Sequence, residues 1–488
     1  MLFLNYKSKS EPERASSAEA EQNLPDIKVY RHAPCSEEQS SNKPVKNLLN
    51  NTTCQVIALI LVTVIVYFPI LGNDFLIYWD DKWQVMNEYT EGGFTVDNIR
   101  AILTEFYYGQ YSPLNAIIYV LIYALFGYNP LVFHLLSLLL HTGCVCLVYF
   151  IIKRLFKQTN RVRIRQASAI AWITALIFAV HPLNVEAVAW ISASKILVYS
   201  FFFLAATYTY LQFLDNRKPG LYILTLVLFT LSFGGKEQAV VLPVWLAMVY
   251  WLLGYSLKSR RVWMQLIPFF LLALFFGIVT MLSNAAVGTG PLSDQTFFPL
   301  WQRLVLCCYS LFEYIAKFIF PYNLLYIYPF PILVGEALPA WMLFYPAFMI
   351  IIALTLHKYI LKWPVATGLV FFLINMALVL HIIPLSRFTI VADRYMYIPV
   401  VGLAFIVAYY FIEFILKKKG TIRYVVIGCF TGFILYFCIY SNLRSREWKD
   451  TDSIKKEVRE LVKKRKDYVP DKVDNLLKNE QDMPLNKE

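Results

Sequence analysis

The chain has 488 residues, a formal net charge of +12 and a mean hydropathy of +0.51, with 58% hydrophobic and 16% charged residues. Soluble proteins carry about a quarter charged residues, so this composition excludes an ordinary soluble domain. The positive charge does not indicate nucleic-acid binding, because the basic residues fall in short loops between apolar runs of membrane-spanning length. The sequence therefore predicts an all-α polytopic membrane protein.

The predicted organisation has three parts. Residues 1–50 are polar and lack apolar periodicity, which is typical of a disordered tail, here on the cytoplasmic side. Residues 51–440 contain the repeated apolar runs and form the predicted transmembrane domain. Residues 441–488 are a short charged tail, predicted to be partly helical and non-cytoplasmic. This tail is too short for a solenoid array, which needs about three repeats.

The first apolar run, 52–71, is soon followed by two adjacent carboxylates, Asp80 and Asp81. These residues are predicted to lie one short step outside the membrane, at the start of an acidic loop. Within this loop, apolar residues of the segment 96–106 recur at helical spacing, which favours an amphipathic helix in the plane of the membrane. The next apolar run, 113–126, is short for a membrane span.

The positive-inside rule decides which apolar runs cross the membrane. The basic loop 153–165 would lie outside if 113–126 crossed, and the later basic loops would lie outside if 301–320 crossed. Both runs are therefore predicted to be non-spanning helices near the outer interface. About eleven spans remain, with the N-terminus inside and the C-terminus outside. They are 52–71, 131–152, 167–180, 196–214, 221–233, 238–253, 264–282, 341–361, 365–384, 395–416 and 424–440.

Charged residues close to a bilayer are costly and usually functional. On this topology, the non-cytoplasmic side combines acids from the first loop with cations from later loops. A carboxylate can accept the proton of an incoming hydroxyl, and cations can stabilise a departing phosphate, as transfer from an anionic lipid carrier requires. The candidates are Asp80 and Asp81 as catalytic residues, and Lys82, His181, Glu186, Lys195, Lys236, Glu237, Arg387, Asp393, Arg394 and Tyr395 as substrate-binding residues.

Several of these candidates also have a structural explanation. The two aspartates could be solvated loop acids. Arg387, Asp393 and Arg394 could form an ion pair at the end of a span instead of a phosphate site. Lys236 and Glu237 could pair at a helix end rather than contact substrate.

Two histidines, His134 and His141, lie seven residues apart and so share one face of a helix. A metal pair is the alternative here, but no third ligand is evident, so packed, hydrogen-bonded histidines are the prediction. Most of the eight cysteines lie inside apolar runs, with no disulfide framework and no zinc spacing. We expect neither a metal nor a cofactor.

A set of short motifs in a fixed order carries a resemblance to a known family. They are Tyr78–Asp81, Tyr111–Leu114, Leu125–Pro130, Phe133–His134 with His141, His181–Trp190, Gly235–Glu237, Phe320–Leu324 and Ala392–Pro399. Over about residues 55–450, the chain resembles the transmembrane and tetratricopeptide-repeat protein O-mannosyltransferases and their bacterial relatives, within the GT-C glycosyltransferase superfamily.

The resemblance implies a GT-C-like fold and a metal-independent, inverting transfer of a sugar. The donor would be a polyprenyl-phosphate monosaccharide, most simply of mannose, and the acceptor a Ser or Thr hydroxyl of a protein. Asp80 or Asp81 falls at the position of the superfamily's first-loop acid, the general base. Arg394 falls at the position expected for a cation that holds the donor phosphate.

The sequence departs from the family pattern in three places. Ser112 stands where relatives usually carry Arg, and Ser194 and Ile196 stand where they often carry Arg and Asp. These changes affect the expected handling of the donor. No tetratricopeptide array follows the last apolar run, which affects the expected choice of acceptor. This feature and the short loops favour a bacterial inner membrane over the endoplasmic reticulum.

The sequence interpretation is a polyprenyl-phosphate-sugar-dependent glycosyltransferase with its site on the non-cytoplasmic side. Its partners would be the lipid-linked sugar, an acceptor protein or glycan and membrane lipid, without nucleic acid. Three alternatives stay open: a transferase that uses the same donor class to modify a lipid or polysaccharide, a non-enzymatic transporter of lipid-linked sugars, and an inactive scaffold. Transporters place polar groups near the midplane, often with internal repeats, whereas the charged candidates here cluster at span ends.

Overall fold

The computed structural model describes residues 51–77, 79–159, 164–288, 297–328, 330–383 and 389–454. Within these residues the secondary structure is helical, and a single isolated bridge, between Tyr107 and Gln110, is the only β pairing. The predicted all-α polytopic membrane protein is therefore confirmed. The predicted disorder of 1–50 and the partly helical end of the chain after residue 454 lie outside the described residues.

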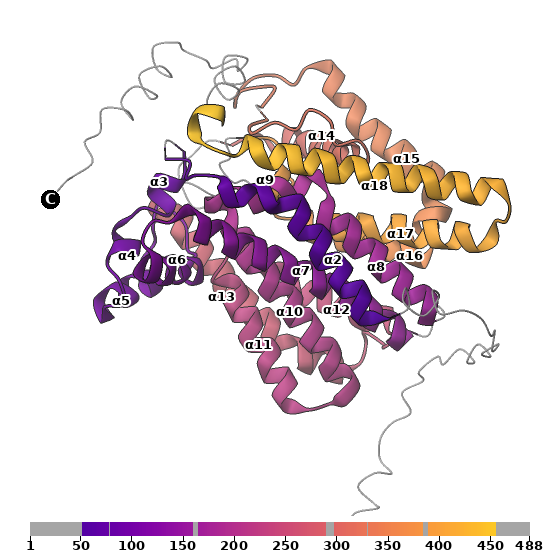
Figure 1. The fold of residues 1–488 in the computed structure, drawn as a ribbon, viewed down its shortest axis with the longest axis horizontal. Coiled ribbons are helices and arrows are strands. Elements are labelled where there is room, and N and C mark those ends of the chain that lie inside the picture. Colours follow the sequence, from indigo (N-terminus) through magenta and orange to yellow (C-terminus); the bar gives the residue numbers. More distant parts are fainter. Residues whose placement is uncertain are drawn as a thin grey trace, which may run out of the picture.

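The helices run side by side in one elongated bundle, with the short helices α3 to α6 gathered at one end (Figure 1). The α-helices are α2 Thr52–Tyr67, α3 Asp81–Gln84, α4 Glu88–Glu91, α5 Val96–Thr104, α6 Pro113–Phe126, α7 Pro130–Thr159, α8 Ile164–Val180, α9 Val185–Ala189, α10 Ser194–Asn216, α11 Pro219–Phe233, α12 Leu242–Leu252, α13 Arg260–Ala286, α14 Leu300–Ile319, α15 Phe344–Ile360, α16 Trp363–Met376, α17 Val400–Lys417 and α18 Thr421–Glu447. The 3₁₀ segments are η1 Phe68–Gly72, η2 Pro182–Asn184, η3 Ile191–Ala193, η4 Glu237–Val241, η5 Ala340–Leu343 and η6 Asp393–Met396.

Seven helices in the described part of the chain are long and apolar enough to cross a membrane, or eight if α8 and the bent segment after it count as one span. This establishes an integral, multi-pass membrane protein. Three shorter apolar helices, at 219–233, 237–252 and 363–376, fall where further spans were predicted. Length and composition therefore account for seven or eight spans, and the predicted number of about eleven is not confirmed.

The centre of the bundle is formed by α7, α8, α10 and α17, whose facing side chains are buried. Helices in lipid gain little from hydrophobic burial and rely on close packing, often through small residues. Here α16 and α17 cross at two glycines: a Cβ on Gly368 would lie 2.4 Å from the carbonyl oxygen of Gly402. By contrast, α15 buries none of its residues. Its exposed apolar surface is therefore the kind that faces lipid.

Two apolar helices, α6 and α14, lie along the end of the bundle that carries the first loop. The start of α6 is fixed there because Leu114 N–H donates to the carbonyl of Gly234, at the end of α11 (2.9 Å), and α6 leads within four residues into the start of α7. Along α14, Arg303 Nη1 donates to the carbonyl of Ile382 (2.7 Å) and the carbonyl of Phe318 contacts His181 Nε2 (3.1 Å). These contacts fix both helices to neighbouring loops, and their predicted non-spanning placement stays a prediction from loop charge.

Candidate active site

The loops that follow α2, α8 and α11 meet the loop before α17 at the same end of the bundle. Asp81, at the start of α3, joins the first two of these loops. Its Oδ2 accepts the N–H of Leu76 (2.8 Å), and its Oδ1 accepts the N–H of Ser192 (2.9 Å) and the hydroxyl of Ser192. These bonds fix the first loop onto η3, immediately before α10. Asp81 is therefore a buried carboxylate whose two oxygens are both occupied.

Burial dominates the electrostatics of Asp81. Removal from water raises the pKa of Asp81 to about 6, and the neighbouring charge of Asp80 adds to this, although the hydrogen bonds from Ser192 and Leu76 oppose it. A carboxylate that is fully enclosed cannot reach an acceptor hydroxyl in this conformation. The structure therefore gives Asp81 a structural position, rather than the position expected of a general base.

Asp80 occupies a different environment one residue earlier. It is half-buried, and its Oδ1 accepts the indole N–H of Trp83 (3.2 Å). Its charge acts on both Lys195 and Arg394, which come from distant parts of the chain. Of the two predicted catalytic acids, Asp80 is thus the one that is accessible and close to cations.

Lys195 lies in the first turn of α10. Its Nζ donates to the side-chain oxygens of Gln84 (2.9 Å) and Gln110 (2.7 Å), both from the first loop. The charges of Lys236, Asp80, Glu237 and Arg394 all act on it. Lys195 is therefore the residue through which the predicted acids and cations come together.

The three residues that depart from the family pattern, Ser194, Ile196 and Ser112, lie next to this lysine or at the start of α6. Ser194 hydrogen-bonds Tyr119 (2.7 Å) and donates to Asn115 (3.2 Å), which ties α10 to α6. Ile196 is buried, and Ser112 is half-buried at the start of α6. In this chain the first two positions therefore hold packing and hydrogen-bonding roles between helices.

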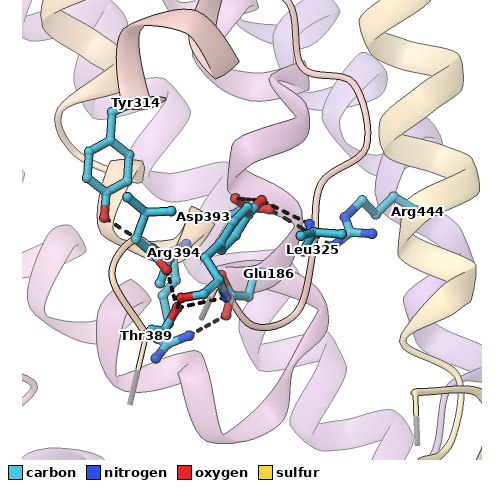
Figure 2. A network of polar contacts seen from close by, with 10 residues as sticks. Glu186, Tyr314, Leu325, Thr389, Asp393, Arg394 and Arg444 are labelled. Carbon is cyan, nitrogen blue, oxygen red and sulfur yellow. Dashed lines mark hydrogen bonds and ion pairs between the residues drawn. The ribbon is translucent and has the colours of Figure 1, made fainter. Parts of the chain in front are cut away.

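Arg394 in η6 forms an ion pair with Glu186 in α9 (Figure 2). Its guanidinium also lies over two aromatic rings, 5.5 Å from the centroid of Trp190 and 5.1 Å from that of Tyr395. Burial lowers the pKa of Arg394, but the charge of Glu186 more than offsets this, so the guanidinium keeps its proton. The Arg394 side chain remains 21% exposed, and its Nη2 makes no hydrogen bond to any residue that the structure describes.

Asp393, next to Arg394, pairs in another direction (Figure 2). Its Oδ1 accepts the hydroxyl of Tyr328 (2.8 Å), and its Oδ2 lies 3.9 Å from Nη2 of Arg444 in α18. Burial raises the pKa of Asp393, against the attraction of Arg444. Asp393 and Arg444 therefore form a buried ion pair behind the site, whereas Arg394 faces the acid-and-cation cluster.

Lys236, Glu237 and Tyr395 complete the cluster. The ammonium of Lys236 is buried and lies 5.4 Å from the ring centroid of Tyr395, a cation–π distance. Glu237 is exposed, and its charge acts on Lys195. The structure thus brings Lys236 and Arg394 to the same aromatic ring.

Of the remaining predicted site residues, His181 and Lys82 lie apart from the cluster, and one lies outside the described residues. His181 is buried; its Nδ1 accepts the N–H of Leu183 (3.2 Å), and its ring stacks on Phe318. It therefore supports the backbone rather than a ligand. Lys82 is half-buried on α3 and makes no ion pair within the described part of the chain. Arg387 lies outside the described residues.

The two histidines of α7 are packed within the bundle. His141 contacts the hydroxyl of Tyr397 (2.7 Å) and the carbonyl of Ala179 (3.1 Å), and His134 is buried. Among the described residues, no three His, Cys, Asp or Glu side chains converge in a way that could hold a metal ion. Packing and hydrogen bonding thus account for His141.

Several residues that complete the site escaped sequence reasoning. Arg444 carried one usable signal, since it is a cation at the predicted non-cytoplasmic end of the last apolar run, against the positive-inside trend. Gln84, Gln110 and Ser192 carried none, because neutral polar residues in a loop are common. Their importance depends on contacts with residues that are distant in the chain.

The fold and the cluster define a class: an all-α, multi-pass membrane protein with accessible acids and several cations gathered at one end of its helix bundle. Sequence comparison places it more narrowly. The chain is 28% identical over 215 residues to the protein O-mannosyl-transferase F38B6.6 of Caenorhabditis elegans, which covers 42% of this chain and 28% of the relative. It is 30% identical over 163 residues to the human protein O-mannosyl-transferase TMTC1, covering 31% and 17%.

A further relative is the human protein O-mannosyl-transferase TMTC4, 31% identical over 143 residues, covering 27% of this chain and 19% of the relative. No family model matches the chain. These findings confirm the resemblance to the protein O-mannosyl-transferases that the ordered motifs indicate. The matches span less than a third of each of these relatives.

Proposed function

We propose that the chain is an inverting glycosyltransferase. It would move a monosaccharide, mannose in the first instance, from a polyprenyl-phosphate carrier to a Ser or Thr hydroxyl of a protein. The names of the relatives support the sugar and the protein acceptor. The observation that carries the proposal is electrostatic: the charge of the half-buried Asp80 carboxylate acts on both Lys195 and Arg394.

In this proposal Asp80 is the general base. The acceptor O–H gives its proton to the Asp80 carboxylate while the oxygen forms the new bond to the anomeric carbon. The bond between that carbon and the phosphate oxygen breaks, and the phosphate leaves with the electron pair. Asp81 is enclosed and so cannot be the second carboxyl group that a retaining reaction needs as its nucleophile, which favours a single displacement.

The cations stabilise the leaving phosphate. Arg394 holds Glu186 through Nη1, which leaves Nη2 for a phosphate oxygen, and its planar guanidinium suits that ligand. Lys236, which lies 5.4 Å from the centroid of the Tyr395 ring, adds a second positive charge. Lys195 interacts electrostatically with both of these cations and with Asp80. The proposed reaction therefore uses protein cations for charge stabilisation and no cofactor beyond the lipid-linked donor.

Purified full-length protein in nanodiscs tests the reaction. It is supplied with a polyprenyl-phospho-mannose donor and a peptide that contains Ser and Thr. We expect a mannosylated peptide with inverted anomeric configuration, and a loss of about 10²- to 10⁴-fold in kcat for Asp80→Asn. An Asp80→Asn protein that turns over at the wild-type rate would remove the assigned role.

Two of the alternatives that the sequence left open predict different products. A transferase that modifies lipids or polysaccharides would leave glycopeptides unchanged in a deletion strain and alter its glycolipids instead. A transporter would move the lipid-linked sugar across vesicles without forming product. The acid-and-cation cluster lies at one end of the bundle, which favours an enzyme over midplane transport.

The proposal places the site on the non-cytoplasmic side of the membrane. The sequence-based preference for a bacterial inner membrane over the endoplasmic reticulum stays a prediction, and the animal origin of the relatives points the other way. Fractionation of the tagged chain from its source cells decides the membrane. Accessibility labelling that put residues 79–82 and 393–395 on opposite sides of the bilayer would contradict the shared site.

A further inference from the structure

The first loop borders a polar cavity beside the candidate active site. It has a volume of about 50 Å³ and lies between α3, α5 and α6. Its walls combine aromatic rings with amide and carboxylate groups, a mixture typical of ligand sites rather than of packed core. The lining residues that matter here are Trp83, Gln84, Glu105, Tyr107 and Gln110.

A tight turn builds one wall of this cavity. Tyr107 and Gln110 pair across the turn, and the two residues between them have positive φ, 47° at Tyr108 and 70° at Gly109. Two successive positive φ values are characteristic of a type I′ hairpin turn, which sets its flanking residues side by side. Gly109 packs against the end of α13, where an added Cβ would lie 2.4 Å from Val287. The wall is therefore fixed to the bundle.

The cavity adjoins the acid and the lysine of the candidate active site. The indole of Trp83 lines it and donates to Asp80 (3.2 Å). Both glutamines also line it, and their side-chain oxygens accept from Lys195. Neither glutamine Nε2 donates to a residue that the structure describes, so these amides are available to a ligand. The cavity thus lies on the Asp80 side of the cluster.

Glu105 is the charged residue among those that line the cavity, and the loop that carries it is acidic. The segment 73–112 carries seven carboxylates and two cations. Glu105, in the cavity wall, accepts the hydroxyl of Tyr89 on Oε2 (2.8 Å), and its Oε1 accepts no hydrogen bond within the described residues. A negative, partly unsatisfied wall favours a cationic or hydrogen-bond-donating group.

We propose that this cavity binds the acceptor polypeptide, and that it takes a basic side chain, Lys or Arg, close to the acceptor hydroxyl. This inference rests on the proposed function. The cavity is partly open to its surroundings, so a side chain of a bound polypeptide can enter it from outside. The carboxylate of Glu105 also attracts a cationic segment, whereas a neutral glycan gains no such attraction. Glu105 would pair with the basic side chain, and the rings of Trp83 and Tyr107 would contact its methylene stem.

Peptide binding and turnover test the proposal separately. Two peptides share a central Thr flanked by either arginines or glutamates, and each is titrated onto the full-length protein in nanodiscs without donor, by fluorescence anisotropy. We expect the arginine peptide to bind more tightly, and Glu105→Gln to weaken it by about three- to ten-fold, since a partly exposed ion pair contributes modestly. The difference should shrink as salt is raised. Glu105→Lys should reverse the preference between the two peptides.

A matched control separates this site from general loop charge. Asp97→Asn removes a carboxylate from the same loop, on α5, but Asp97 does not line the cavity. It should leave the binding of both peptides within about two-fold of wild type. Equal effects of Glu105→Gln and Asp97→Asn would overturn the inference. Displacement of the peptide by mannose oligosaccharides but not by a second basic peptide would also overturn it.

The turnover arm distinguishes this inference from the function beneath it. With donor present, Glu105→Gln should raise KM for the arginine peptide by the same factor as Kd. If no variant or wild-type protein turns over donor while the Glu105-dependent binding persists, the proposed transferase fails and the basic-peptide site stands. If turnover occurs with no dependence on Glu105 or on peptide charge, the transferase stands and this inference fails.

Discussion

Glu186 contacts Arg394 twice: Oε1 pairs with the guanidinium, and Oε2 accepts the backbone N–H of Arg394 (2.7 Å). The two residues are 208 positions apart, so this contact fastens the loop before α17 to α9. The Glu186 side chain is only 3% exposed, which leaves its charge dependent on this partner. The contact therefore sets the orientation of the cation that we propose for the donor phosphate.

We predict that Glu186→Gln lowers the free energy of unfolding by about 2–3 kcal/mol, because it leaves the Arg394 charge partly buried without its partner. Thermal unfolding in detergent measures the effect. Glu413→Gln is the control, since the Glu413–Lys417 pair on α17 is exposed and worth at most about 0.5 kcal/mol. Equal shifts in Tm for the two variants would contradict a supporting role for Glu186.

Substitution of the two adjacent aspartates should affect different properties, stability for Asp81 and turnover for Asp80. Asp81→Asn places an amide NH₂ among the N–H donors of Leu76 and Ser192, so we expect it to cost about 2 kcal/mol of stability. Asp80→Asn keeps an oxygen that can accept from Trp83, so its Tm should stay close to wild type while kcat falls. Tm and kcat measured on both variants check this separation, and a Tm loss confined to Asp80→Asn would reverse the assignment.

The sequence predicted the helical class and the apolar helices, because hydropathy is a local signal, whereas the non-spanning character of 113–126 and 301–320 stays a prediction from loop charge. It also identified the loops that converge. It could not distinguish Asp80 from Asp81, since their difference depends on Ser192, which is 111 residues away. Adjacent residues have the same neighbours in the sequence, but in the folded chain their side chains contact different residues.

The same limit applies to Asp393 and Arg394. Sequence reasoning grouped them as one ion pair or one phosphate site, whereas the structure separates them between Arg444 and Glu186. In a 3₁₀ segment, consecutive side chains point in different directions, so neighbours meet different elements. Which element lies on which side is decided by tertiary packing.

Stability should depend on pH through Asp81. Its pKa is raised to about 6, from 3.8, mainly by burial, so the folded protein binds more protons than the unfolded chain between these values. The contribution of Asp81 is therefore fully present below about pH 4 and is lost as pH rises through about 6, by about 3 kcal/mol in all. Tm of the wild type relative to Asp81→Asn should fall across this interval. A constant difference between pH 4 and pH 7 would mean that Asp81 does not titrate there.

Gly235 offers a test of how α10 and α11 hold the cations together. A Cβ at Gly235 would lie 2.5 Å from the backbone nitrogen of Tyr199 and 3.0 Å from the carbonyl oxygen of Lys195, and neither backbone atom can turn aside. Gly235→Ala should therefore push the two helices apart and cost about 2 kcal/mol or more of stability.

The same displacement should reach the chemistry, because Lys236 follows Gly235 directly and Lys195 itself moves. We expect donor turnover to fall with Gly235→Ala even at temperatures where the protein stays folded. Gly220→Ala is the matched control, since a Cβ at Gly220, at the other end of α11, would meet nothing within 4 Å. Turnover and Tm measured for both variants distinguish cation placement from helix propensity. If Gly235→Ala kept wild-type turnover, the distance between Lys195 and Lys236 would not matter to the reaction, and the proposed cation cluster would lose its role.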